Sequence, residues 1–266
     1  MTLRLRFIVG AAALALVAGT SPAIAAPADG YVRLAHLSPD TPAVDVYLYS
    51  QGKKTPKLVI KHVGYGALSP YQKLGTGSYT VAMRPADAAA GSKPVLSADV
   101  KVEAGNAYTV AGMGPYKGIK LQVLKDSSTL NEGNAGIRVL AASLKSQKID
   151  VKARGLTIKG LDFAAISEYQ QAKAGPSTVK VTGSADSTSA KLDLAAGSLY
   201  TVVVLDGETG LKLLPVRDTA SGKVVPNGAI DTGLGGLAKQ GDSSTLPVLA
   251  GIFLLAGLFI VRRIVR

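Results

Sequence analysis

The stretch that decides the fold is AGNAYTV at residues 104–110, because it returns as AGSLYTV at residues 196–202. Further landmarks recur in the same order, at offsets that shrink along the chain from 105 to 98 to 92 residues. Agreement over a whole unit indicates an internal repeat whose second copy has shorter connections. The matched pairs include Arg33 with Arg138, Asp45 with Asp150, Tyr71 with Tyr169, Thr109 with Thr201, and Asp126 with Asp218.

Each copy is expected to fold into short β-strands. Apolar and polar residues alternate along 44–49, 96–102 and 119–123, which is the two-residue period of a strand with one buried face. Gly, Pro, Asn and Ser lie between these runs, as turns require. About seven or eight short strands in about 95 residues predict a β-sandwich. The sequence therefore predicts an all-β chain with two tandem antiparallel β-sandwich domains, at residues 26–128 and 129–218.

The N-terminal end has the pattern of a secretory signal peptide. Two arginines precede an uncharged run rich in Ala, Leu and Val, and Ala23 and Ala25 form a small-x-small cleavage site. A retained membrane anchor is the alternative, but its apolar run would be longer. We expect residues 1–25 to be removed by cleavage between Ala25 and Ala26, which implies that the chain is exported.

The C-terminal end has the pattern of a membrane anchor. Residues 246–261 carry no charge and are followed by Arg262, Arg263 and Arg266. A helix of this length spans about 24 Å, and the apolar residues after the first two arginines extend it toward the hydrocarbon thickness of about 30 Å. We expect a C-terminal transmembrane helix at residues 246–265, with the three arginines as its stop-transfer signal.

Residues 219–245 contain six glycines and are expected to form a flexible tether between the domains and this helix. By the positive-inside rule, the arginines lie in the cytoplasm and the domains face outward. The predicted organisation is a single-pass protein of the cell membrane, which contacts membrane lipid through its C-terminal helix. Its domains are extracellular and its C-terminus is cytoplasmic.

One stretch resembles a known family. The sequence VRLAHLSPDTPAVDVY at residues 32–47 is similar to the opening of the bacterial family called domain of unknown function 4397, and GSYTV at residues 77–81 also fits its pattern. The resemblance covers roughly residues 31–218 and implies an extracellular β-sandwich with no settled activity. The Ala- and Gly-rich composition suggests an actinobacterial source. At the motif positions His36, Pro39 and Asp40, the second copy has Ala141, Leu144 and Lys145.

His36, Asp40 and Asp45 lie close together in the sequence, as the residues of a metal or acid–base site would. The run SPDTP at residues 38–42 is also typical of a turn, in which Pro fixes φ and Asp or Ser bonds the backbone. Asp45 returns as Asp150 in a copy that lacks the histidine, so we interpret it as structural. His36 and Asp40 are kept as candidate ligand-binding residues, and no metal site is predicted.

Tyr47 and Tyr49 are the second pair of candidate ligand-binding residues. They alternate with Val44, Val46 and Leu48, so we expect them to point away from the core, toward solvent or a neighbouring domain. Exposed tyrosines stack on sugars or anchor a protein partner. The alternative is ordinary strand composition, because Tyr favours β-sheets.

The composition narrows the chemistry. The chain has no cysteine and two histidines, which excludes a disulfide framework, a thiolate metal site and a cysteine nucleophile. The sequence contains no nucleophile elbow, no zinc-protease motif and no phosphate-binding loop. It therefore predicts neither an enzyme nor a cofactor.

The charge points to anionic partners. The formal charge is +12, and residues 26–245 account for +7 of it, with 25 basic and 18 acidic residues. The lysines are spread along the sequence, so nucleic acid is not an expected partner. An anionic envelope polymer or a surface protein is the expected partner.

The predicted function is therefore a non-catalytic, membrane-anchored module of the cell surface, structural or adhesive. The alternative is a module that binds carbohydrate or an anionic envelope polymer through the tyrosines and lysines. A hydrolase built on scattered Asp, Glu and Ser residues is a third, more remote hypothesis.

Overall fold

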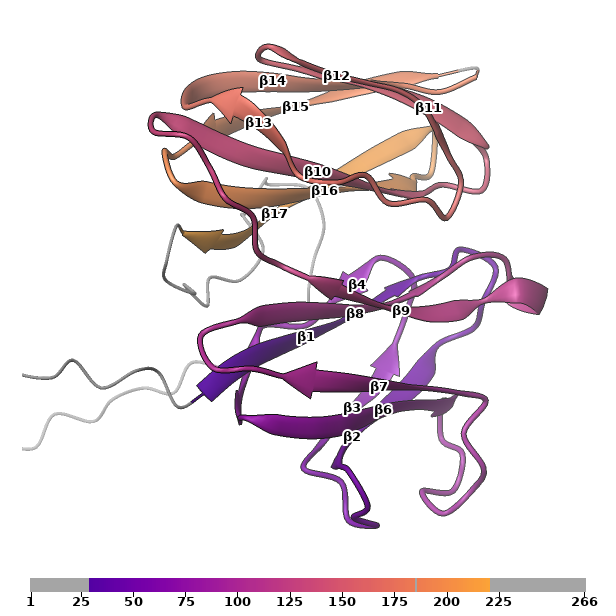
Figure 1. Cartoon of the computed structure of the whole chain (residues 1–266). Helices are drawn as coiled ribbons and strands as arrows, with labels where there is room; N and C mark the ends of the chain where they lie inside the picture. The colour runs from indigo at the N-terminus through magenta and orange to yellow at the C-terminus, as the bar shows by residue number, and fades with distance from the viewer. Residues whose placement is uncertain (1–28, 185, 221–266) are drawn as a thin grey trace, which may run out of the picture. The chain divides into compact units, whose positions relative to one another are not determined.

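The computed structural model describes residues 29–184 and 186–220, which form two β-sandwiches in sequence (Figure 1). Apart from one 3₁₀ turn at Tyr116–Gly118, every regular element of these residues is a β-strand. The described chain is thus all-β and contains four sheets.

The first sandwich is made of two sheets. In one sheet the strands follow the order β4-β1-β8-β9, with β5 also paired to β1, and in the other they follow the order β3-β2-β6-β7. The strands are β1 (Asp29–Leu37), β2 (Val44–Ser50), β3 (Leu58–Val63), β4 (Ala67–Leu68), β5 (Gln72–Gly75), β6 (Gly77–Pro85), β7 (Leu96–Val102), β8 (Ala107–Met113) and β9 (Lys120–Lys125).

The second sandwich repeats this arrangement, except that β4 has no strand as its counterpart. Its sheets follow the orders β13-β10-β16-β17 and β12-β11-β14-β15. An isolated bridge between Leu140 and Ile166 stands where β1 pairs with β4 in the first copy. The strands are β10 (Asn134–Ala142), β11 (Lys148–Ala153), β12 (Leu156–Asp162), β13 (Gln170–Lys173), β14 (Gly175–Thr182), β15 (Ser187–Leu194), β16 (Ser198–Asp206) and β17 (Leu211–Ala220).

Each sandwich contains one parallel strand pair, so the prediction of purely antiparallel sandwiches was wrong. β1 runs parallel to β8, and β10 runs parallel to β16, over seven residue pairs each. In both copies, all four strands of the opposite sheet lie between the two strands of the pair in the sequence. Such a long connection permits parallel pairing. Alternation of apolar and polar residues identifies the buried face of a strand. It does not tell whether the strand runs parallel or antiparallel to its neighbour.

The prediction of a C-terminal transmembrane helix finds no support in the part of the chain that the structure describes. Within residues 29–184 and 186–220, no helix is long and apolar enough to cross a membrane. Residues 246–265, where the helix was expected, lie outside the described residues, as do the expected signal peptide at residues 1–25 and the tether from residue 221 onward.

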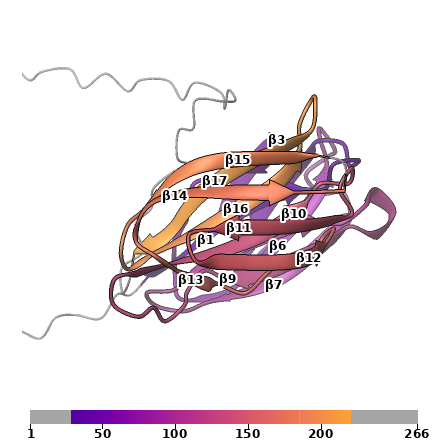
Figure 2. The same ribbon diagram turned by 90° about the horizontal axis from the view of Figure 1, so that it is seen from above.

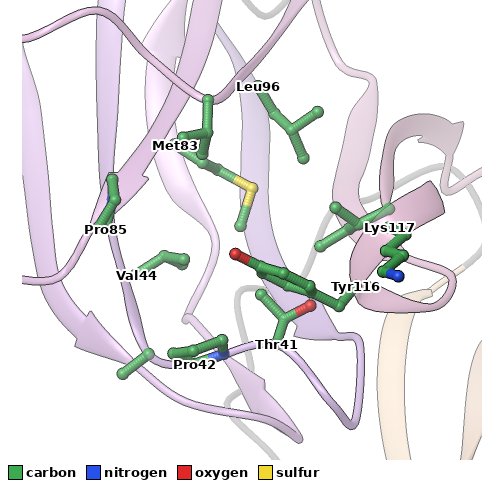
Figure 3. Close-up of a pocket in the computed structure, with 11 residues that line it drawn as sticks. Thr41, Pro42, Val44, Met83, Pro85, Leu96, Tyr116 and Lys117 are labelled. Carbon is green, nitrogen blue, oxygen red and sulfur yellow. The ribbon is translucent and has the colours of Figure 1, made fainter.

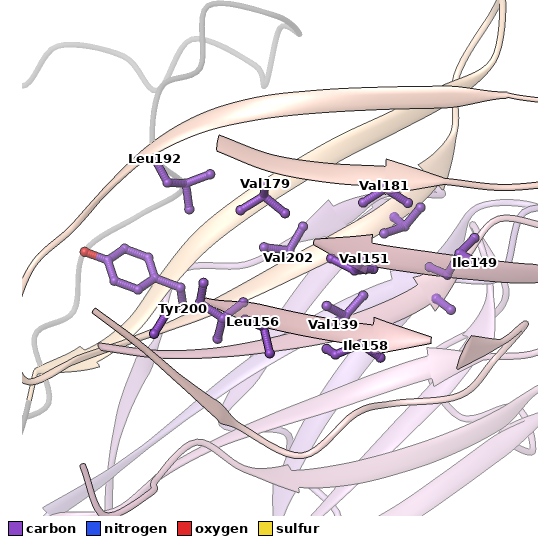
Figure 4. Packing of buried hydrophobic residues seen from close by; sticks show 14 of the residues in the cluster. Val139, Ile149, Val151, Leu156, Ile158, Val179, Val181, Leu192, Tyr200 and Val202 are labelled. Carbon is purple, nitrogen blue, oxygen red and sulfur yellow. The ribbon is translucent and has the colours of Figure 1, made fainter. Parts of the chain in front are cut away.

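Each sandwich encloses an apolar core of its own. In the second sandwich, the inward side chains of both sheets meet, and Figure 4 shows Val139, Val151, Val179 and Val202 in this core. These valines are fully buried. The first sandwich has an equivalent core between its two sheets. Both cores follow from the two-residue period of the strands.

A third apolar cluster joins the two sandwiches. The strands β1, β8, β10 and β16 are buried on both faces as a result, which explains their nearly continuous apolar sequences. Both sandwiches belong to one compact unit. The cluster combines Ala35, Leu37, Ala111 and Met113 of the first sandwich with Leu140, Ala142, Val203 and Leu205 of the second.

The same interface holds two buried ion pairs that cross between the copies. The Arg33 guanidinium pairs with the Asp218 carboxylate of the second copy, and the Arg138 guanidinium pairs with Asp126 of the first copy. All four residues are buried. Burial alone would lower the pKa of Arg33, but the Asp218 carboxylate, acting together with Tyr71, Asp126 and Tyr169, outweighs burial, and the pKa is raised. The arginine therefore stays charged inside the molecule.

Within each copy, a threonine and a tyrosine complete the network. Arg33 Nε donates to Thr109 Oγ1 at 2.8 Å, and the guanidinium carbon lies 4.8 Å from the centre of the Tyr71 ring. The hydroxyls of Tyr71 and Thr109 both donate to Asp126 at 2.6 Å. Every polar partner of the network is thus a landmark of the sequence repeat. The second copy repeats the pattern with Arg138, Thr201, Tyr169 and Asp218.

Candidate functional site

A pocket of about 340 Å³ lies in the first sandwich (Figure 3). It is formed where the loop after β1, the ends of β6 and β7, and the 3₁₀ turn before β9 come together. A volume at the lower end of the range of ligand sites suits one apolar side chain or a ring of similar size. The lining residues are Thr41, Pro42, Ala43, Val44, Met83, Pro85, Val95, Leu96, Tyr116, Lys117 and Ile119.

The rim of the pocket is unusually apolar for a surface. Val95 and Tyr116 are 59% and 57% exposed, more than the other exposed large hydrophobic side chains of the described residues. Met83, by contrast, is buried, and Figure 3 shows it with Val44 and Tyr116 around one space. Apolar side chains that stay exposed beside an apolar pocket mark a surface suited to a partner.

The motif of the first copy holds the wall of this pocket in place. Ser38 Oγ donates to the carbonyl oxygen of Gly114 and lies 2.6 Å from Thr41 Oγ1. Asp40 Oδ1 accepts the backbone N–H of Tyr116 at 2.9 Å. Asp40, predicted as a ligand-binding residue, therefore links the loop after β1 to the 3₁₀ turn and positions Tyr116 at the rim.

His36, the other candidate of the motif, is fully buried behind this loop. Its Nε2 lies 3.3 Å from the carbonyl oxygen of Pro42, and its Nδ1 accepts the backbone N–H of Ser38 at 3.4 Å. One ring nitrogen donates and the other accepts, which is the pattern of a neutral imidazole. Burial lowers the pKa of His36 below its ordinary value. The ring therefore acts as a neutral support for the loop that lines the pocket.

Acidification is expected to destabilise the fold through His36. Below the ordinary pKa of about 6.5, the unfolded chain takes up a proton on this residue and the folded chain does not. The contribution of His36 to the free energy of unfolding is fully present above that pH. It falls as the pH drops through this value, by at most about 1.4 kcal/mol per pH unit for one proton. Urea unfolding at about pH 7.5, 6.5 and 5.5 measures the slope.

The variant His36→Gln should have a flatter pH dependence between these values, since the titrating ring is gone. The matched control is His62→Gln, because the His62 ring is exposed and lies 3.0 Å from Asp87 at the surface. If His36→Gln keeps the full slope of the wild type, the stated role of the buried ring is wrong.

The pocket is a feature of the first copy. The connection between β6 and β7 spans residues 86–95, whereas the connection between β14 and β15 spans residues 183–186. The six additional residues account for the drop in repeat offset from 98 to 92, and they lead into Val95 and Leu96 of the rim. The second copy also turns from β16 to β17 through residues 207–210, where the first copy has the 3₁₀ turn that carries Tyr116.

The two predicted tyrosines lie on the opposite side of β2 from the core, but the structure covers them. Tyr47 is 2% exposed, and Tyr49 is half-buried. Their rings stack with centroids 6.2 Å apart, and the Arg84 guanidinium lies 4.5 Å from the centre of the Tyr47 ring. Arg84 Nε donates to the carbonyl oxygen of Ser92 at 2.9 Å, which holds the long β6–β7 loop nearby. The expectation of a solvent-facing tyrosine pair was therefore wrong for Tyr47.

Asp45 is fully buried, and its carboxylate accepts hydrogen bonds from the backbone. Its carboxylate accepts the N–H groups of His62 at 2.9 Å and Asp87 at 3.3 Å. Burial would raise its pKa, but these two hydrogen bonds together with Lys61 lower it. The structural interpretation of Asp45 agrees with this geometry. The remaining predicted positions, Ala25, Ala26, Arg262, Arg263 and Arg266, lie outside the described residues.

Comparison with protein families gives one match, to the family described as "Domain of unknown function (DUF4397)". The family model matches the chain twice, at residues 30–152 and 137–230. The two overlapping matches cover both copies of the repeat. The resemblance noted in the sequence is confirmed. No curated protein is similar enough in sequence to count as a relative.

Among solved structures, the chain is similar to the tip fimbrial protein Mfa3 of Porphyromonas gingivalis, with 9% identity and a TM-score of 0.23. The alignment covers 71% of this chain and 99% of that one. A second similar structure is a candidate cell adhesion protein of Bacteroides uniformis, with 7% identity, a TM-score of 0.20, and coverage of 74% and 99%. TM-scores of this size do not establish a common fold.

Proposed function

The chain belongs to the DUF4397 family of domains of unknown function, and we propose that this member is a non-catalytic module of the cell surface that binds a protein partner. The observation that carries the proposal is the apolar pocket of the first sandwich, with Tyr116 and Val95 exposed at its rim. Export is supported by the signal-peptide pattern of residues 1–25.

The geometry of the pocket favours an apolar side chain as its occupant. An aromatic or aliphatic anchor in a desolvated pocket, surrounded by further apolar contacts, is the usual centre of a protein interface. Here Met83 and Val44 form the apolar wall that would receive such an anchor. Val95 and Tyr116 at the rim extend the apolar area outward. The pocket is also too small for an extended polymer.

The buried acids of the described residues support a non-catalytic role, because each is occupied by structural partners. Asp126 and Asp218 neutralise the two buried arginines. Asp45 accepts hydrogen bonds from the backbone N–H groups of His62 at 2.9 Å and Asp87 at 3.3 Å. A catalytic carboxylate would instead face a space that a substrate can enter.

The pocket is expected to bind p-cresol, which mimics a tyrosine side chain. Met83 lies in the pocket and Met113 lies in the cluster between the sandwiches, so ¹³C-methyl labelling of methionine supplies a probe and an internal control. We expect a saturable shift of the Met83 signal at millimolar p-cresol, about the affinity that a ligand of this size reaches. The Met113 signal should stay in place.

The variant Ala43→Trp places a ring in the pocket from its wall and should abolish the Met83 shift. The variant Val59→Trp is the matched control, because Val59 is exposed and does not line the pocket. Equal shifts of Met83 and Met113, or an unchanged titration in Ala43→Trp, would refute the pocket as a binding site.

A further inference from the structure

The outer face of the second sandwich gathers lysines that are scattered in the sequence. The sheet β12-β11-β14-β15 turns one side of each strand to solvent, and Figure 2 shows its four strands side by side. Thr157, Lys152, Lys180 and Ser189 are directly paired across the four strands and all four are exposed. They form one polar row across the sheet.

The lysines of this face lie close together. Lys152 and Lys180 are directly opposite on β11 and β14, so their Cβ atoms are about 4.5–5.5 Å apart. Lys191 pairs with Thr178 and lies diagonally from Lys180, about 7–8 Å away. None of these three lysines forms an ion pair with a described residue. Like charges placed directly opposite on a sheet repel each other, so an anion on this face would relieve the repulsion.

No acidic residue stands directly opposite any of these three lysines. Asp150 accepts the backbone N–H of Gly160 at 2.7 Å, and Asp193 lies opposite Pro176, two residues beyond Lys191 along β15. Asp162 is engaged with Lys148 at 2.8 Å. The three lysines therefore keep their charge available on a surface that also carries the exposed hydroxyls of Thr157, Thr178 and Ser189.

The fold itself does not require these lysines, because the first copy has other residues at the same places. The pair Tyr47–Ala82 occupies the position of Lys152–Lys180, and Asp99 occupies the position of Lys191. The lysine face is therefore a property of the second copy alone. Three lysines on one face, at positions where the first copy has none, give this face a positive charge that attracts anions.

We propose that this face, defined by Lys152, Lys180 and Lys191 with the neighbouring hydroxyls, binds a linear anionic polysaccharide. Lysines present point charges that suit carboxylate or sulfate groups without demanding one geometry. Threonine and serine hydroxyls donate to and accept from sugar hydroxyls. The face holds no aromatic side chain, so it lacks the stacking platform that single-stranded nucleic acids need. It lies in the other sandwich from the pocket, so the proposal does not depend on the proposed function.

The test measures binding of the full chain to polygalacturonate, a linear polysaccharide with one carboxylate per sugar, with neutral dextran as the matched uncharged polymer. We expect binding to polygalacturonate at about 50 mM salt and its loss at about 1 M salt, where the screening length falls to about 3 Å. Dextran should not bind. Binding of both polymers alike would overturn the electrostatic basis of the proposal.

The variant Lys152→Ala/Lys180→Ala/Lys191→Ala should weaken this binding about tenfold, since each exposed charge contact contributes about two- to threefold. The control removes the same net charge from exposed lysines of the first sandwich, Lys53→Ala/Lys54→Ala/Lys101→Ala, and should change the affinity less than about twofold. Equal losses in both triple variants would show that only net charge matters and would overturn the site. Equally tight, face-dependent binding to single-stranded DNA or to anionic vesicles would overturn the assignment to polysaccharide.

Discussion

The variant Arg33→Met is expected to lose about 3–5 kcal/mol of unfolding free energy, because it leaves the fully buried carboxylate of Asp218 without its counter-charge. The hydroxyls of Tyr169 and Thr201 still donate to that carboxylate, but they do not neutralise it. Urea unfolding followed by far-ultraviolet circular dichroism measures the loss.

The double variant Arg33→Met/Asp218→Leu separates the cost of an orphaned charge from the value of the ion pair. Replacing both partners of a buried pair with apolar residues is often neutral or stabilising, so most of the stability should return. The surface pair Lys73–Asp29, at 2.9 Å, supplies the control, since Lys73→Met should have only a small fraction of the effect. If Arg33→Met is no more destabilising than Lys73→Met, the network contributes little to the fold.

This network explains why the repeat could be detected in the sequence. Arg33, Tyr71, Thr109 and Asp126 depend on one another through hydrogen bonds and the arginine–tyrosine contact, so both copies keep all four residue types. The sequence could not reveal that each arginine pairs with the aspartate of the other copy. Pairing inside a copy satisfies the same chemistry, and only the packing of the two sandwiches decides between them.

The site was harder to predict than the repeat. Alternation along β2 placed Tyr47 away from the core, but it could not predict that Arg84, far along the chain, would cover the ring. Tyr116 was overlooked because it lies in a connection without periodicity. A signal was nevertheless present in the six residues by which the β6–β7 connection exceeds its counterpart, since loops are where related domains differ and where binding residues concentrate.

The first sandwich on its own, as residues 29–128, is expected not to stay monomeric. Separation from the second sandwich exposes the apolar side chains of Ala35, Leu37, Ala111 and Met113. It also leaves Arg33 and Asp126 without the partners that neutralise them. A contiguous apolar face with unpaired charges drives association. Size-exclusion chromatography with light scattering measures the oligomeric state at micromolar concentration.

The form of that association follows from the reciprocity of the two ion pairs. Arg33 binds Asp218, the counterpart of Asp126, while Arg138, the counterpart of Arg33, binds Asp126. Two identical first sandwiches can therefore meet through the same surface, as a two-fold symmetric interface requires, with Arg33 of each pairing with Asp126 of the other. We expect a dimer that Asp126→Asn weakens, because each interface then holds two uncompensated arginines. The intact chain of both sandwiches should stay monomeric at the same concentration, since its interface is already filled. A stable monomer of the isolated sandwich would show that the contact between the two copies contributes little to the stability of either sandwich.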